Sequence, residues 1–251
     1  MAPLTLGLLA ITVVATSFLS GIFGMAGGII LLGTLLVVLD VAPAMVLFGT
    51  TQMASNGWRA ILWRAHVHWR LIVGYVVGAC VAFTAMRFVA WVPPKSFMYI
   101  ALGASPFIAN ALPKSLEPDI TRPAVPYISG AALTVITLLA GATGTLLDVL
   151  FQKSKLDRIS IVATKAVTQT FSHVLRIAYF GSFATAVDSV VPWWAYPSAI
   201  GLAMVGTTFA ARVLRAMSNE DFRKWSWRII YTVSCTFIAR GLWLLGTGAP
   251  D

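Results

Sequence analysis

The sequence predicts an all-α polytopic membrane protein with seven to eight transmembrane segments, arranged as two related and inverted repeats. Three observations lead to this prediction. Apolar residues make up 58% of the 251 residues and charged residues only 11%, too few charges for a soluble domain of this size. Apolar runs of the length needed to span a bilayer, about 20 residues, recur along the chain. The first and fifth of these runs are interrupted by glycines at corresponding places.

The apolar runs define a single transmembrane domain over residues 1–251, with repeat 1 at about 4–112 and repeat 2 at about 125–246. The fourth run is short and carries Pro106 and Asn110, so its full crossing is in doubt. Tryptophans near the run ends suit the headgroup layer. The runs are 4–39, 43–63, 70–91, 96–112, 125–152, 158–182, 192–214 and 226–246.

Charge predicts the orientation of the chain. Most of the net charge of +9 lies at segment ends and in loops around 59–70, 153–158 and 212–228. Basic loops face the cytoplasm, so we expect the N-terminus and the 153–158 loop inside, in a multi-pass protein of the cell inner membrane. If the fourth and fifth runs each crossed the membrane once, the 153–158 loop would lie outside. One of them must therefore fail to cross or cross twice, and the short fourth run is the simpler candidate. The same charges argue against nucleic-acid binding.

No enzyme, cofactor or metal site is expected. Cys80 and Cys235 lie in apolar runs without a CxxC motif, and His66 and His68 have no carboxylate or cysteine nearby. The sequence contains no GxSxG, HExxH or P-loop motif, so the chain itself does not hydrolyse ATP. Ser172 and His173 are adjacent, which places them on different helix faces.

The glycine breaks predict a binding site. Gly24, Gly27 and Gly28 interrupt the first run, and Thr143, Gly144 and Thr145 belong to the break that interrupts the fifth. Gly21 and Gly24 match Gly141 and Gly144 at an offset of 120 positions. A break inside a span exposes backbone N–H groups at the start of the next half-helix, which must line a protein-enclosed or watery cavity. Helix N-termini attract anions, and paired breaks indicate a midplane site in a transporter. The alternative is that the glycines are close-packing points between helices.

A polar stripe follows each break. At an offset of 113, Thr51, Gln52, Ser55, Asn56 and Arg59 match Thr164, Lys165, Thr168, Gln169 and Ser172. The i, i+3, i+4, i+7 spacing places each set on one side of a helix. From these stripes we expect Thr51, Gln52, Asn56, Lys165, Thr168 and Gln169 to contact a small anionic substrate.

Lys165 is the main candidate for the charge that binds the anion, because ionisable groups within spans usually face an interior cavity. The alternatives are an ion pair with Asp148 alone, or snorkelling to the interface. Both ligand contact and pairing can hold together, and Asp148 would then tune or gate Lys165. Asp148 and His173 are candidates for coupling, although a helix–helix hydrogen bond is the simpler role for His173.

The glycine-rich break, the start Gly49-Thr50-Thr51 and the run from Ala163 to Gln169 resemble the TauE/SafE family of sulfite and organosulfonate exporters. The resemblance covers essentially the whole chain. It implies export of sulfite or an organosulfonate such as sulfoacetate from the bacterial cytoplasm. Met25 and Ala26 in the first break, and Thr143 and Thr145 in the second, stand where the family often has glycine, and these departures bear on the substrate more than on the fold.

Other functions stay open at this stage. The residues alone lead to an anion and two half-sites, and only the resemblance leads to sulfur. The alternatives are a passive anion channel, a transporter of a non-sulfur carboxylate anion, or a non-transporting assembly subunit. Energy coupling and oligomeric state, a homo-oligomer included, are left undetermined by the sequence.

Overall fold

The computed structural model describes residues 3–23, 25–111, 113, 118–141, 143–152, 154–183, 191–217 and 219–248, and every regular element in these ranges is helical. The first half holds α1 (Pro3–Phe23), α2 (Met25–Val38), α3 (Val41–Leu62), the 3-10 turn η1 (Arg64–His66), α4 (Trp69–Val89) and α5 (Lys95–Ala111). The second half holds α6 (Val125–Ala140), α7 (Gly144–Gln152), α8 (Arg158–Gly181), α9 (Ala195–Ala216) and α10 (Asn219–Thr247). The predicted helical fold class is confirmed, while the number of spans stays a prediction.

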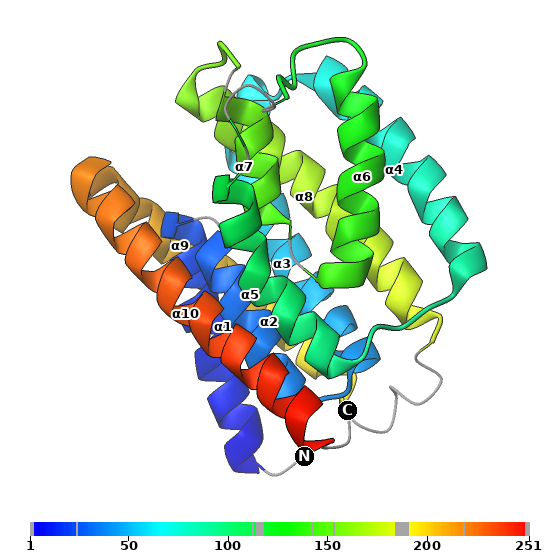
Figure 1. Ribbon diagram of the computed structural model, residues 1–251. Coiled ribbons are helices and arrows are strands. Elements are labelled where there is room, and N and C mark those ends of the chain that lie inside the picture. Colours follow the sequence, from blue (N-terminus) through cyan, green and yellow to red (C-terminus); the bar gives the residue numbers. More distant parts are fainter. Residues whose placement is uncertain are drawn as a thin grey trace.

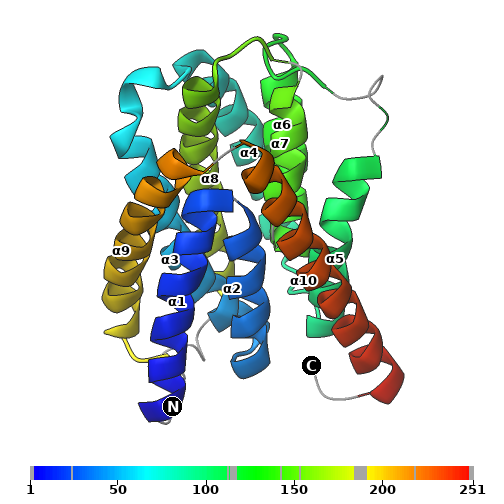
Figure 2. The same ribbon diagram turned by 90° about the vertical axis from the view of Figure 1, so that its left-hand side faces the viewer.

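Each of the two long apolar runs folds into two helices, and the chain reverses direction at the break (Figures 1 and 2). In the first half, Gly27 of α2 lies against the backbone of Thr16 and Ser20 of α1. In the second half, the backbone N–H of Ile120, just before α6, donates to the carbonyl of Leu150 near the end of α7, at 3.1 Å. Each run therefore starts and ends on the same side of the molecule, and the expected break within a single crossing is wrong.

This reversal changes the predicted orientation. The start of α1 and the end of α10 lie at one end of the bundle, and η1 and the turn between α7 and α8 lie at the opposite end (Figure 2). The N-terminal helix thus begins on the side opposite the basic 59–70 and 153–158 loops, not beside them as expected. It is also the fifth run, not the short fourth one, that returns to its own side.

Helix α5 is the short fourth run. It has 17 residues, with Pro106 inside it, and at 1.5 Å per residue its length is about 25 Å, less than the roughly 30 Å of a hydrocarbon core. The chain then continues through the described residues 118–124 to the start of α6.

The helices pack in pairs around a central pair, α3 and α8. Around it, α1 packs against α9, α4 against α6, and α5 against α10. Backbones approach closely between α4 and α6, because Gly78 lies against the carbonyl of Tyr127 and Gly130 against the carbonyl of Tyr75. Small residues allow such contact between membrane helices.

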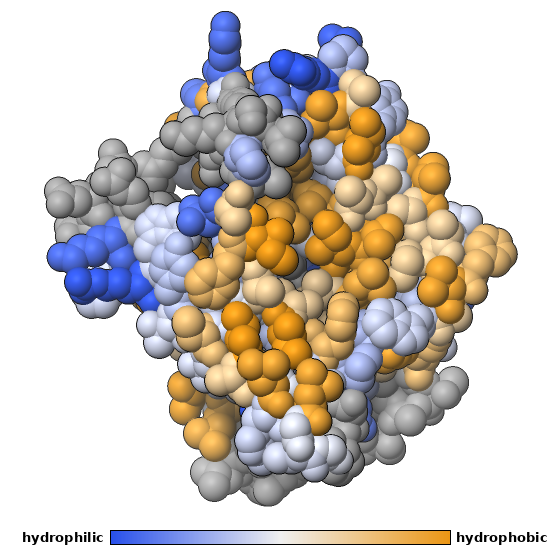
Figure 3. Space-filling view, in the orientation of Figure 1, coloured by the Kyte–Doolittle hydropathy of each residue, from blue (hydrophilic) through white to orange (hydrophobic). Residues whose placement is uncertain are grey.

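The outward faces are apolar. Val73, Val77 and Val81 form an exposed stripe on α4 at four-residue spacing. Figure 3 shows apolar side chains over the middle of one face, with hydrophilic ones towards its upper edge and left side. By length and composition α4 and the Trp227–Thr247 part of α10 are long and apolar enough to cross a bilayer. Such a surface is stable in lipid.

Candidate functional site

The two predicted polar stripes face the interior of the bundle, along the contact between α3 and α8. On α3, Thr51, Gln52, Ser55 and Asn56 are all buried. On α8, Thr164, Thr168 and Ser172 are buried, while Lys165 and Gln169 are half-buried. Both helices carry too many polar residues to face lipid, so they are stable only in the middle of the bundle.

Each stripe also bonds to a helix of the other half. Ser55 of α3 shares a hydrogen bond of 2.7 Å with Thr207 of α9. Ser172 of α8 shares one of 2.9 Å with Tyr75 of α4. In a membrane interior such polar bonds between helices hold the pairs in register.

Lys165 forms an ion pair with Asp148 of α7. The side chains of Lys165 and Asp148 are 20% and 34% exposed, so the pair is open to a ligand or to water on one side. Arg59 of α3 lies close enough for its positive charge to act on Lys165. Counted as formal charges, Lys165 and Arg59 outnumber Asp148 in this region, which suits an anion.

The first break brings Gly28 to the stripe but not Gly27. Gly28 of α2 lies against the side-chain amide of Gln52 and near the ring of Phe48. Gly27 instead fills the contact between α2 and α1, which is the close-packing role that the sequence left open as an alternative. Gly24 lies outside the described residues.

A hydrogen bond between two side chains of the same half spans the second break. Gly141 ends α6 with φ of 82°, a conformation that L side chains rarely adopt. Across the break the hydroxyls of Thr137 and Thr143 are 2.7 Å apart, and the carbonyl of Thr143 accepts from the N–H of Leu147. Gly144 begins α7 as expected, and the side chain of Thr145 lies outside the described residues.

Three of the predicted donors are engaged within their own helices. Thr51 donates to the carbonyl of Leu47, Asn56 to that of Gln52, and Thr168 to that of Lys165, at 2.8–2.9 Å. The hydroxyls of Thr51 and Thr168 can donate to an anion only by leaving those bonds, whereas the amide of Asn56 keeps its second N–H. The amide of Gln52 makes no side-chain hydrogen bond within the described part of the chain, so its N–H groups stay available.

His173 is fixed by two neighbours. Its Nδ1 lies 2.8 Å from Nη1 of Arg176, one turn along α8, and its ring meets that of Phe48 edge-on, with centroids 5.6 Å apart. A guanidinium can only donate, so Nδ1 accepts and carries no proton. The hydrogen bond expected for His173 is thus present, but to its own helix and not to another.

Arg176 is the residue that the sequence reading missed. It is 1% exposed, lies over the ring of Phe48 at 4.8 Å, and donates to the carbonyl of Gly141 at the second break. An arginine inside an apolar run, one turn beyond a polar stripe, was the available signal. Arg59 was placed in the polar stripe and interpreted first as a topology determinant, and it donates to the carbonyl of Ser20 at the first break, at 3.0 Å.

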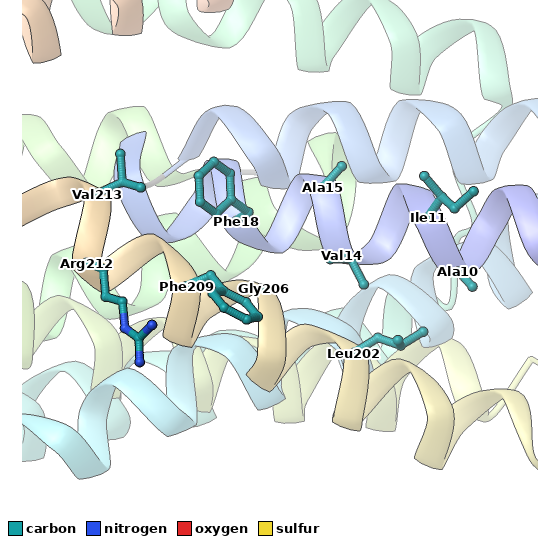
Figure 4. Close-up of a pocket in the computed structure, with 10 residues that line it drawn as sticks. All are labelled: Ala10, Ile11, Val14, Ala15, Phe18, Leu202, Gly206, Phe209, Arg212 and Val213. Atoms are coloured by element: carbon teal, nitrogen blue, oxygen red, sulfur yellow. The ribbon is translucent and has the colours of Figure 1, made fainter.

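A separate groove of about 730 Å³ lies between α1 and α9 (Figure 4). Its walls are apolar, and among the described residues that line it only Arg212 is charged. Few donors face this groove, so it does not suit a small anion. The residues that line it are Ala10, Ile11, Val14, Ala15, Phe18, Leu202, Gly206, Phe209, Arg212 and Val213.

Comparison with protein families shows which family the chain resembles along most of its length. The model of a family described as "Sulfite exporter TauE/SafE" matches residues 8–236, which includes both breaks and both stripes. Comparison with curated proteins and with solved structures gives no significant match.

Proposed function

Because the chain belongs to the sulfite exporter TauE/SafE family and is therefore a membrane transporter of sulfur anions in general, we propose that it exports sulfite or an organosulfonate such as sulfoacetate. The substrate binds at a central site between α3 and α8, against the two helix breaks. Lys165 is its main contact, with Gln52, Gln169 and the N-terminal end of α7 as further donors.

One observation carries this proposal: positively charged side chains outnumber negative ones where α3, α7 and α8 meet inside the bundle. Lys165 of α8 and Arg59 of α3 outnumber Asp148 of α7, and α3 and α8 each follow the helix that begins at a break. Burying a charge in a membrane is unfavourable unless it has a partner or a function. A small dianion or monoanion that binds beside Lys165 supplies the missing negative charge.

The proposed site is shared by two inverted repeats. Helices of equivalent order run in opposite directions along the bundle (Figure 2), and their contacts correspond: α1 packs on α9 as α6 packs on α4. Side chains correspond as well. At the offsets found in the sequence, Gln52 beside Gly28 matches Lys165 beside Asp148. The equivalence supports alternating access by movement of one half against the other.

The orientation follows from charge. With η1 and the 154–157 turn in the cytoplasm, the start of α1 faces the outer side of the inner membrane. The α6–α7 pair then enters from the cytoplasm, and Lys165 lies at the end of the path that an exported anion meets first.

A binding and flux experiment tests the proposal. Purified protein is titrated with sulfite, sulfoacetate, sulfate and acetate while its thermal unfolding is followed, and export is measured in proteoliposomes. We expect sulfite or sulfoacetate to stabilise the protein most and to be carried with saturable kinetics. Lys165→Met should abolish this transport, whereas Lys155→Met, in an exposed loop, should not.

Three results would contradict the proposal. If acetate stabilised the protein more than every sulfur anion did, sulfur anions would be excluded as the substrate class. Flux that does not saturate would favour a passive channel. Full activity of Lys165→Met would remove Lys165 from the site.

A further inference from the structure

Two arginines, one in each half, bond the ends of the helices that precede the breaks. Nη2 of Arg59 donates to the carbonyl of Ser20, which lies in the last turn of α1. Nη2 of Arg176 donates to the carbonyl of Gly141, which ends α6. Ser20 and Gly141 lie at nearly matching positions under the offset of 120. Arg176 lies one turn beyond Ser172, the position that matches Arg59, so the two contacts are similar in kind but displaced by one helical turn.

These carbonyls are the negative ends of helix dipoles. The last four carbonyls of an α-helix have no partner within the helix, and they carry a partial negative charge. Inside a bilayer no water satisfies them. A guanidinium that donates to them both completes their hydrogen bonding and offsets their charge.

Neither arginine has a carboxylate partner in the described ranges, where the ion pairs are Lys95 with Asp40 and Lys165 with Asp148. Their countercharge is the helix end, with the Phe48 ring added for Arg176. Because α2 and α7 begin within a few residues of these carbonyls, neutralising the negative ends leaves the positive N-terminal ends dominant at both breaks.

A donor is also left unused beside each break. The hydroxyl of Ser20 and the Nε of Arg176 are buried and have no hydrogen-bond partner in the described part of the protein. Buried polar groups without partners are rare, and each points to a ligand, a water or strain. Both groups can donate to anion oxygens.

We propose that Arg59 and Arg176 are a pair of positioning residues that hold the two helix breaks in shape and make the potential there selective for anions. The inference rests on the proposed function, since it assigns the selectivity of that same site. It differs from simple anchoring of helices, which would need the hydrogen bond but not the charge.

The experiment separates the charge from the hydrogen-bond geometry. Arg176→Lys keeps the charge and loses the guanidinium fork, Arg176→Gln loses the charge, and the same two changes are made at Arg59. The matched control is Arg240→Gln, since Arg240 also lies over an aromatic ring, that of Trp243, at 4.4 Å, but on the exposed face of α10. KM and maximal rate for sulfite are measured in proteoliposomes, together with hydrogen exchange of the backbone amides at 16–27 and 137–147.

We expect Arg176→Gln to raise KM about tenfold, the value for losing one charge-assisted interaction, and to speed amide exchange at 137–147. Arg176→Lys should keep KM near the wild-type value while exchange still increases. Arg59→Gln should act in the same way on 16–27, and Arg240→Gln should change neither quantity.

Two outcomes would overturn the inference. In the first, both arginine-to-glutamine variants fold and keep the wild-type KM and the wild-type rate of amide exchange. In the second, the arginine-to-lysine and arginine-to-glutamine variants raise KM equally, which would leave the arginines only an anchoring role. If the wild type carries and binds none of the anions, the proposed function fails. Hydrogen exchange at the breaks still decides the positioning role in that case.

Discussion

The ion pair between Lys165 and Asp148 can be tested by its energy as well as by transport. Removing one partner of a fully buried pair costs about 3–5 kcal/mol, whereas exposed pairs contribute about 0–1 kcal/mol. With side chains 20% and 34% exposed, this pair lies between these limits. We expect Lys165→Met and Asp148→Asn each to lower the free energy of unfolding by about 2 kcal/mol, an intermediate value.

The double variant Lys165→Met/Asp148→Asn leaves no unpaired charge in this pair. We therefore expect it to be about as stable as either single variant or more so, with a coupling energy of about 2 kcal/mol. The double variant should lose no more stability than a single one, whereas its transport should be lost, because under the proposed function the positive charge of Lys165 binds the anion. This separates the structural role of Lys165 from its role in binding.

The assay is reversible unfolding in mixed micelles, applied to the full set of variants. The matched control is the pair Lys95 and Asp40, at 3.1 Å, whose carboxylate is 81% exposed. A cycle at that pair should give a coupling energy below about 1 kcal/mol. Additive effects of Lys165→Met and Asp148→Asn would refute the reasoning, because they would mean that the two charges do not interact.

Three further predictions concern local contacts. Tyr75→Phe removes the hydrogen bond to Ser172 and should lower the free energy of unfolding by about 1 kcal/mol in the same assay. Gly130→Ala forces a methyl group against backbone between α6 and α4 and should cost about 3 kcal/mol, whereas Gly201→Ala, with open space around it, should be neutral. Hydrogen bonds from Ser160 and Ile159 at the start of α8 lower the pKa of Asp157, so its cap stabilises the protein above the unfolded-state pKa and is lost as pH falls through the folded one. Asp157→Ala should therefore flatten the acid side of the stability profile.

The sequence predicted the polar stripes well because they depend on local geometry. Helical spacing alone places Gln52 and Asn56 on one side of α3, and burial of that side follows from the cost of polar groups in lipid. The pairing of Lys165 with Asp148 was foreseen as an alternative because Asp148 is the only acid within the fifth run.

Chain direction could not be predicted in the same way. Hydropathy reports that a run is apolar, but a run of 36 residues from 4 to 39 fits either a broken span or a returning pair of helices. The choice depends on tertiary contacts such as that of Gly27 with the α1 backbone. Arg59 and Arg176 were missed for a similar reason, since their partners are backbone carbonyls that no residue type reveals.

The two halves place different chemistry at equivalent positions. Gln52 and Gly28 leave the first half-site neutral, with donors but no ion pair, whereas Lys165 and Asp148 make the second half-site charged. Under the proposed function, an anion that moves between the half-sites would exchange hydrogen bonds from a neutral amide for contact with a lysine that already has a carboxylate partner. In that scheme Asp148 would compete for Lys165 and keep the anion from binding too tightly to leave. Asp148→Asn should therefore lower KM for sulfite and also lower the maximal rate in proteoliposomes, and a raised KM would show that Asp148 helps to hold the anion.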